Sequence, residues 1–98
     1  MRPGSRFYSA VCETEVVIVR AADVVELSCG GVPMADAAPA VRSSGPARGH
    51  DTGTVLGKRY EDGEAGIEVL CVKGGRGSVA VEGRLLSLKS AKPLPASD

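Results

Sequence analysis

The chain has 98 residues, of which twelve are Lys or Arg and twelve are Asp or Glu, so its formal net charge is zero. This length suits one small domain, and the charge balance argues against a nucleic-acid-binding protein that relies on bulk positive charge. The longest apolar run, residues 16–19, is far too short to cross a bilayer. Because the first residues are not followed by an apolar signal core, we expect a cytoplasmic protein with no membrane partner.

Glycine and proline interrupt the sequence throughout, with thirteen glycines and six prolines in 98 residues. Valine dominates the larger apolar residues, and β-branched side chains favour strands. Short apolar stretches separated by turn residues are typical of an all-β domain with short strands. We therefore predict a small all-β protein.

The first module is expected over residues 6–34, as a β-hairpin. Residues 15–20 contain four consecutive apolar β-branched side chains and should form a strand. After a turn at 21–23, residues 24–28 should return as a second strand. The glycine-rich segment 29–34 should then end the hairpin, because glycine permits the positive φ that a tight turn requires.

Residues 35–53 are nearly free of large apolar side chains, and we expect a flexible linker there. A second module over 54–92 should be an antiparallel β-meander, with candidate strands at 55–60, 67–73, 78–82 and 84–89 and a hairpin turn at 74–77. The period of two predicts one buried cluster, formed by Val69, Val79, Val81, Leu86 and Leu88. Residues 93–98 should be a disordered tail. Because each module is small, the two should pack into one compact domain.

Three cysteines, Cys12, Cys29 and Cys71, are the most informative residues for function. An odd number of cysteines in a protein expected to be cytosolic argues against a structural disulfide framework. Cys71 lies between Leu70 and Val72 in a predicted strand, and this setting is typical of a small buried apolar residue. Cys12 and Cys29 belong to a wider pattern.

That pattern has three parts, which are Tyr8-Ser9-Ala10-Val11-Cys12, the valine-rich run 16–19, and Leu27-Ser28-Cys29-Gly30-Gly31-Val32-Pro33-Met34. Together they resemble desulforedoxin and the N-terminal domain of desulfoferrodoxin over residues 7–34. This family binds one iron through a Cys-x-x-Cys pair and a later Cys-Cys-Gly-x-x-Met turn. The resemblance implies a rubredoxin/desulforedoxin-like hairpin, whose four ligand positions would be Ser9, Cys12, Ser28 and Cys29.

Serine stands at two of these four positions, and a tetrahedral iron or zinc site needs four good donors. We therefore expect a degenerate knuckle that binds no metal. Two alternatives stay open. Cys71 and His50 could complete a zinc or iron site with Cys12 and Cys29, or Cys12 and Cys29 could form a dithiol switch if they approach disulfide distance.

No catalytic set is evident, because the single histidine, His50, lies in the expected linker and a general base needs a rigid shell around it. We predict a non-catalytic accessory or protein-interaction protein without a cofactor. Its edge strands would be available to a protein partner of unknown identity or to a second copy in a homodimer. The alternative function is that of a small zinc- or iron-binding protein or a thiol-redox protein that uses Cys12 and Cys29.

Overall fold

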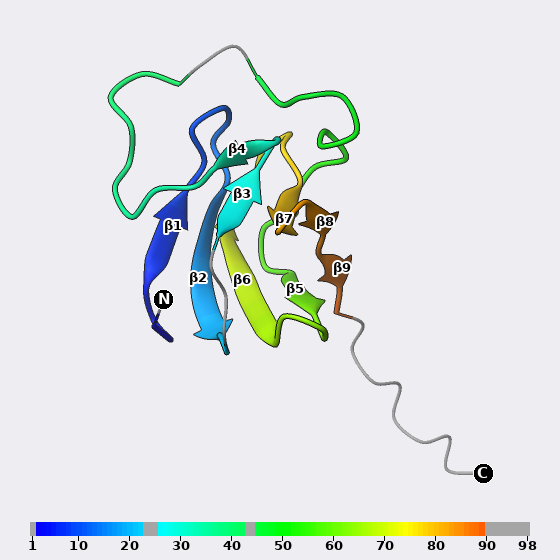
Figure 1. Cartoon of the computed structure of the whole chain (residues 1–98). Helices are drawn as coiled ribbons and strands as arrows, with labels where there is room; N and C mark the ends of the chain where they lie inside the picture. Colours follow the sequence, from blue (N-terminus) through cyan, green and yellow to red (C-terminus); the bar gives the residue numbers. More distant parts are fainter. Residues whose placement is uncertain (1, 23–25, 43–44, 90–98) are drawn as a thin grey trace, which may run out of the picture.

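The structure is a computed structural model that describes residues 2–22, 26–42 and 45–89. Nine strands and no helix occur within these residues, and every strand pair is antiparallel. The strands form two sheets (Figure 1). The prediction of a small all-β protein is confirmed.

The larger sheet has five strands in the order β1-β2-β6-β5-β9. They are β1 (Arg6–Tyr8), β2 (Glu15–Arg20), β6 (Ile67–Lys73), β5 (Arg59–Asp62) and β9 (Ser87–Leu88). The smaller sheet has four strands in the order β4-β3-β7-β8. They are β4 (Val32–Pro33), β3 (Leu27–Cys29), β7 (Val79–Val81) and β8 (Arg84–Leu85).

Each sheet combines strands from both halves of the chain, with the N-terminal strands on one side and the C-terminal strands on the other. In the larger sheet β2 pairs with β6, and in the smaller sheet β3 pairs with β7. The strand 15–20 therefore does not form the expected hairpin with a return strand over residues 24–28. Residues 24–25 of that expected strand lie outside the described residues. Likewise, the C-terminal strands are divided between the two sheets instead of forming one meander. A physical reason is that an isolated two-stranded hairpin is marginal in water, whereas β2 beside β6 gives a wide apolar face.

One hydrophobic core lies between the sheets, and both contribute to it. The larger sheet supplies Val16, Ile18, Ile67 and Val69, and the smaller sheet supplies Leu27, Cys29, Val79 and Val81. The predicted alternation of Ile67, Val69 and Cys71 is confirmed, because all three side chains are buried. Burying each of the larger side chains stabilises the fold by roughly 1.5–3 kcal/mol.

The predicted place of Leu88 in this core is wrong, since its side chain is 54% exposed. The chain changes sheets at the buried residue Leu86: β8 before it pairs with β7, and β9 after it pairs with β5. The period of two therefore does not continue from Leu86 to Leu88. The strand predicted over 55–60 also differs, because β5 begins at Arg59 and the side chains of Val55 and Leu56 are exposed.

The segment expected to be a linker, residues 35–53, is hydrogen-bonded to strands and loops on either side. Ala35 pairs with Tyr8 through both backbone bonds, and the N–H of Ala47 donates to the carbonyl of Gly30. Figure 1 shows this segment passing around the end of the sheets that carries the β1–β2 loop and β4. Residues 43–44, and the expected tail 93–98, lie outside the described residues.

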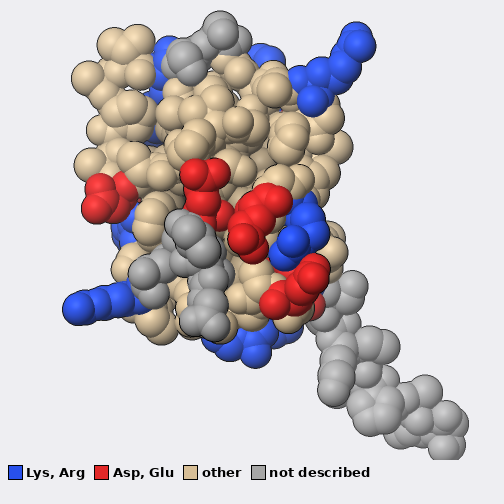
Figure 2. Space-filling model, in the orientation of Figure 1, with Lys and Arg blue, Asp and Glu red and all other residues tan. Residues whose placement is uncertain are grey.

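Charged side chains of both signs lie on the surface (Figure 2). The face seen in Figure 2 carries acidic groups across its middle and basic groups around its edges. Glu68 is the most buried of the described ionic groups in ion pairs, and its carboxylate accepts from Arg59 at 3.2 Å and from Lys89 at 2.9 Å. Within the described residues, no helix has the length and apolar character to span a membrane.

Candidate functional site

The loop between β1 and β2 holds Cys12 in a fixed position. The backbone N–H groups of Val11 and Cys12 both donate to Ser9 Oγ at 3.1 Å, a side-chain turn that serine favours. The N–H of Ser9 donates to the carbonyl of Thr14 at 3.0 Å and closes the loop. From the 35–53 segment, Nε of Arg42 donates to the carbonyl of Cys12.

Three hydrogen-bond partners surround the sulfur of Cys12. Ser9 Oγ lies 3.3 Å from Cys12 Sγ, Thr14 Oγ1 lies 3.2 Å from it, and the N–H of Gly77 donates to it at 3.4 Å. As a thiol, Cys12 donates to these hydroxyl oxygens, and as a thiolate it can accept the hydroxyl protons of Ser9 and Thr14 instead. Such an arrangement favours the thiolate form of Cys12.

Cys29, at the end of β3, brings a second sulfur to the same place. Its Sγ lies 3.9 Å from Cys12 Sγ, although 17 positions separate the two residues in the sequence. Cys29 is fully buried, and Cys12 is 9% exposed. Both cysteines are free thiols. They form a buried dithiol in which one sulfur is nearer to solvent than the other.

The pKa values of the two thiols are shifted in opposite directions. Burial raises the pKa of Cys12, but hydrogen bonds from the Ser9 and Thr14 hydroxyls and from backbone N–H groups outweigh it and lower the pKa to about 7. Burial, together with the nearby charge of Cys12, raises the pKa of Cys29 to about 12. Near neutral pH, Cys12 is therefore the more ionised of the two thiols, and Cys29 stays protonated.

The glycine-rich segment 74–77 packs directly on this dithiol. A Cβ atom on Gly77 would lie 2.9 Å from Cys29 Sγ and 3.1 Å from Cys12 Sγ, and one on Gly75 would lie 2.4 Å from Thr14 Oγ1. The segment was predicted to be a hairpin turn, but it joins β6 and β7, which lie in different sheets. Here glycine provides room for the sulfurs.

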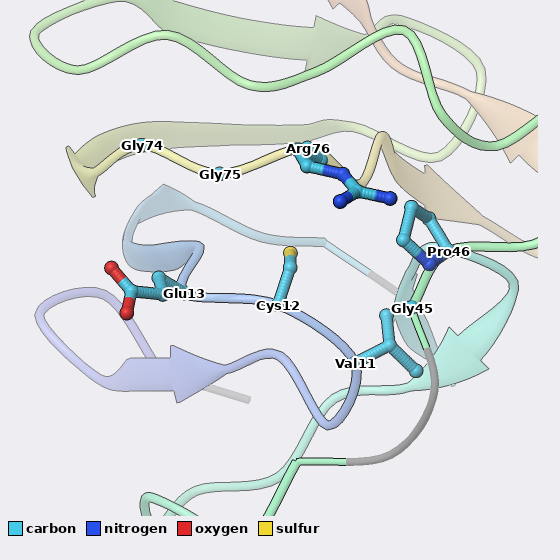
Figure 3. A pocket seen from close by; sticks show the side chains of 8 residues that line it. All are labelled: Val11, Cys12, Glu13, Gly45, Pro46, Gly74, Gly75 and Arg76. Carbon is cyan, nitrogen blue, oxygen red and sulfur yellow. The ribbon is translucent and has the colours of Figure 1, made fainter.

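Cys12 opens into a pocket of about 550 Å³, within the range that holds small ligands. Its lining is formed by Val11, Cys12, Glu13, Gly45, Pro46, Gly74, Gly75 and Arg76. Figure 3 shows the Cys12 sulfur pointing from the β1–β2 loop towards the 74–76 segment, with Pro46 and Arg76 on one side of it and Glu13 on the other. The pocket gives small molecules a route to the sulfur.

Of the four ligand positions that the resemblance implied, Ser9, Cys12 and Cys29 come together and Ser28 does not. Ser28 Oγ lies 3.5 Å from the carbonyl of Ala80, because neighbouring residues of a strand point to opposite faces. Thr14 occupies the place expected for Ser28. Neither Thr14 nor Gly77 was predicted from the sequence, although the position of Thr14 two residues after Cys12 was a usable signal.

The two other candidate donors are not joined to the dithiol by any hydrogen bond among the described residues. The Cys71 thiol donates to the carbonyl of Lys73 at 3.2 Å, and burial raises its pKa. The His50 ring lies beside Gly31, and its buried Nδ1 has no hydrogen-bond partner in the described part of the chain. Within residues 2–22, 26–42 and 45–89, no group of three or more His, Cys, Asp or Glu side chains is arranged to hold a metal ion.

Comparisons with models of protein families, with curated proteins and with solved structures found no significant match to this chain.

Proposed function

We propose that the protein is a thiol–disulfide redox protein in which Cys12 is the attacking thiol and Cys29 the resolving thiol. The observation that carries this proposal is the 3.9 Å separation of the two sulfurs, with two hydroxyl groups and a backbone N–H hydrogen-bonded to Cys12 Sγ. A disulfide needs a sulfur–sulfur distance of about 2.05 Å. A small movement of the two side chains would therefore suffice to form the bond.

The first step is attack by the Cys12 thiolate on a sulfur of a substrate disulfide. A bond forms between Cys12 Sγ and that sulfur, the substrate's S–S bond breaks, and the other substrate sulfur leaves as a thiolate that takes a proton from water. With a pKa of about 7, Cys12 is about half ionised at neutral pH. A thiol with a pKa near the ambient pH combines a large thiolate fraction with good nucleophilicity.

The second step is attack by Cys29 on Cys12 Sγ. Once Cys12 is part of a mixed disulfide, it carries no charge, and one cause of the raised pKa of Cys29 disappears. Cys29 then loses its proton and forms the Cys12–Cys29 bond, and the second half of the substrate leaves as a thiol. The protein dithiol is oxidised by two electrons, and the substrate disulfide is reduced by two.

This function fits the site better than a metal centre does. A structural zinc or iron site takes four donors, whereas two cysteines and two neutral hydroxyls surround this point. The interaction role predicted from the sequence stays a prediction, and a redox protein would also need a partner that reduces or oxidises it.

Thiol titration in denaturant, before and after treatment with 2-hydroxyethyl disulfide, tests the function. The protein should lose two of its three thiols and recover both with dithiothreitol, and its mass should fall by two hydrogen atoms. Cys71→Ser is the matched control and should still form the bond. The Cys12→Ser variant should form neither a mixed disulfide with the reagent nor a bond to Cys29. The Cys29→Ser variant should stop at the mixed disulfide. A wild-type protein that keeps all three thiols would refute the proposal.

A further inference from the structure

The pocket beside Cys12 carries one acidic and one basic side chain, Glu13 and Arg76, and its other lining residues apart from Cys12 are apolar or glycine. We propose that this pocket binds small disulfides that carry both an ammonium and a carboxylate group, and that it presents one of their sulfurs to Cys12. The proposal rests on the thiol-redox function above and adds the class of substrate.

Arg76 supplies a free positive charge at one side of the pocket. Its side chain is exposed, and no ion pair joins it to any residue in the described ranges. The guanidinium lies close to Gly45, where an added Cβ would be 3.7 Å from Arg76 Nη2, and Figure 3 shows it directed towards Pro46. A substrate carboxylate at this position would pair with a planar donor group suited to it.

Glu13 supplies the opposite charge. It directly follows Cys12, its side chain is exposed, and it takes part in no ion pair within the described part of the chain. In Figure 3 its carboxylate lies on the far side of the Cys12 sulfur from the Arg76 guanidinium. An ammonium group and a carboxylate on the same substrate can therefore face opposite charges while the sulfur lies between them.

The depth of the sulfur favours a small substrate over a protein disulfide. Cys12 is only 9% exposed. The side chains of Val11 and Pro46 form an apolar wall of the pocket that leads to its sulfur. A small disulfide can enter a pocket of about 550 Å³, whereas a protein disulfide would have to bring its flanking chain past this wall. The apolar wall suits the methylene groups and the S–S bond of such a molecule.

The reaction balances with one substrate molecule and the reduced protein. The Cys12 thiolate displaces one half of the substrate as a thiol, and Cys29 displaces the other half. Two thiols and one Cys12–Cys29 disulfide result, and two electrons pass from the protein to the substrate. No other oxidant is required.

Four small disulfides test the charge preference: cystine, cationic cystamine, anionic dithiodiglycolate and neutral 2-hydroxyethyl disulfide. For each disulfide, the rate of its reaction with the protein is divided by the rate of its reaction with free 2-mercaptoethanol. This ratio corrects for the intrinsic reactivity of the disulfide. Cystine, which carries both charges, should have the highest ratio. Each matching charge should raise the ratio by about two- to fivefold, as expected for an exposed ion pair.

Single variants assign the two charges. Glu13→Gln should lower the ratio for cystine and cystamine, and Arg76→Gln should lower it for cystine and dithiodiglycolate. The rate of each variant with neutral 2-hydroxyethyl disulfide measures any general effect of the substitution on Cys12, and the ratios for the charged disulfides are compared relative to it. Glu82→Gln and Lys58→Gln are matched controls, because both side chains are exposed and neither lines the pocket.

The outcomes separate the two proposals. If 2-hydroxyethyl disulfide oxidises the dithiol but the four ratios are equal, the substrate class is wrong and the redox function stands. A protein disulfide that reacts faster than all four reagents would also overturn the substrate class. If no reagent produces the Cys12–Cys29 bond, the redox function itself is overturned.

Discussion

Gly77 lies so close to Cys29 that a Cβ atom on it would come within 2.9 Å of the Cys29 sulfur. The same atom would lie 3.1 Å from the Cys12 sulfur. The backbone of Gly77 does not have a positive φ, so the need for glycine here comes from space. The turn between β6 and β7 and the dithiol are thus packed as one unit.

A methyl group at this position should therefore disturb both stability and chemistry. We expect Gly77→Ala to lower the free energy of unfolding by about 1–3 kcal/mol, the cost of overpacking a core, and to slow formation of the Cys12–Cys29 bond. Gly63→Ala is the matched control, because a Cβ there meets no atom within 4 Å. Urea unfolding and the rate of thiol loss measure the two effects. Equal stability of the two variants would contradict the packing described here.

The reactivity of Cys12 should follow its lowered pKa. In a Cys71→Ser background, the rate of Cys12 alkylation by iodoacetamide should rise with pH around a midpoint of about 7. Thr14→Val removes a hydroxyl that stabilises the thiolate while keeping a similar shape, so the midpoint should move to higher pH. Peptide mapping after a short reaction identifies the alkylated cysteine. An unchanged midpoint in Thr14→Val would show that the hydroxyl does not act on the sulfur.

The lowered pKa of Cys12 should also affect the dependence of stability on pH. Cys12 has a pKa of about 7 in the folded protein and a reference value of 9.0. The unfolded chain therefore binds more protons between these values, and stability rises with pH across this window. The contribution is complete above pH 9 and is lost as the pH falls through 7.

We expect Cys12 to contribute about 2 kcal/mol to the free energy of unfolding at pH 8.5 relative to pH 6, because a tenfold change in proton affinity corresponds to about 1.4 kcal/mol. The measurement is urea unfolding under reducing conditions for the parent and for Cys12→Ser, in which this increment should vanish. Cys29 has the opposite effect on stability above pH 9. Because its pKa is raised to about 12 in the folded protein, its contribution to the free energy of unfolding is lost as the pH rises. A parent protein with the same pH profile as Cys12→Ser would contradict the assignment.

Local patterns in the sequence predicted β2 and β6 with their observed bounds, but not the partners of these strands. Alternation correctly placed Ile67, Val69 and Cys71 on one buried face, because the side chains of a strand alternate whatever strand lies beside it. Which strand lies beside β2 depends on how two apolar faces far apart in the sequence cover each other. Leu88 shows the limit, since the change of sheet at Leu86 ends the alternation that predicted its burial.

The candidate site was also only partly predictable. The family resemblance implied that Cys12 and Cys29 share one site, and their sulfurs lie 3.9 Å apart. Thr14 lies only two residues after Cys12, but the role of Gly77 depends on a contact between segments 65 positions apart, from Gly77 N–H to Cys12 Sγ. A local sequence pattern carries no information about such a contact, and glycine in the 74–77 segment has an ordinary local explanation as a turn.

The arrangement around Cys12 makes a sharp prediction about metal binding. Ser9 Oγ, Thr14 Oγ1 and Cys29 Sγ lie 3.3, 3.2 and 3.9 Å from Cys12 Sγ. Zinc–sulfur bonds of about 2.3 Å in a tetrahedron place neighbouring sulfurs about 3.8 Å apart. Four sulfurs at these positions would therefore need only small adjustments to bind zinc.

We expect the double variant Ser9→Cys/Thr14→Cys to bind one zinc ion and to gain thermal stability when zinc is added, since a ligand that binds only the folded state stabilises it. The matched control is Ser9→Cys/Ser28→Cys, which introduces the cysteines at the positions implied by the family resemblance. It should bind no zinc in a four-sulfur site, because residue 28 points away from Cys29 towards the carbonyl of Ala80. Cobalt substitution distinguishes the two, because a tetrahedral thiolate site gives intense visible absorption. Tight zinc binding by the control alone would mean that Ser28, and not Thr14, faces the dithiol.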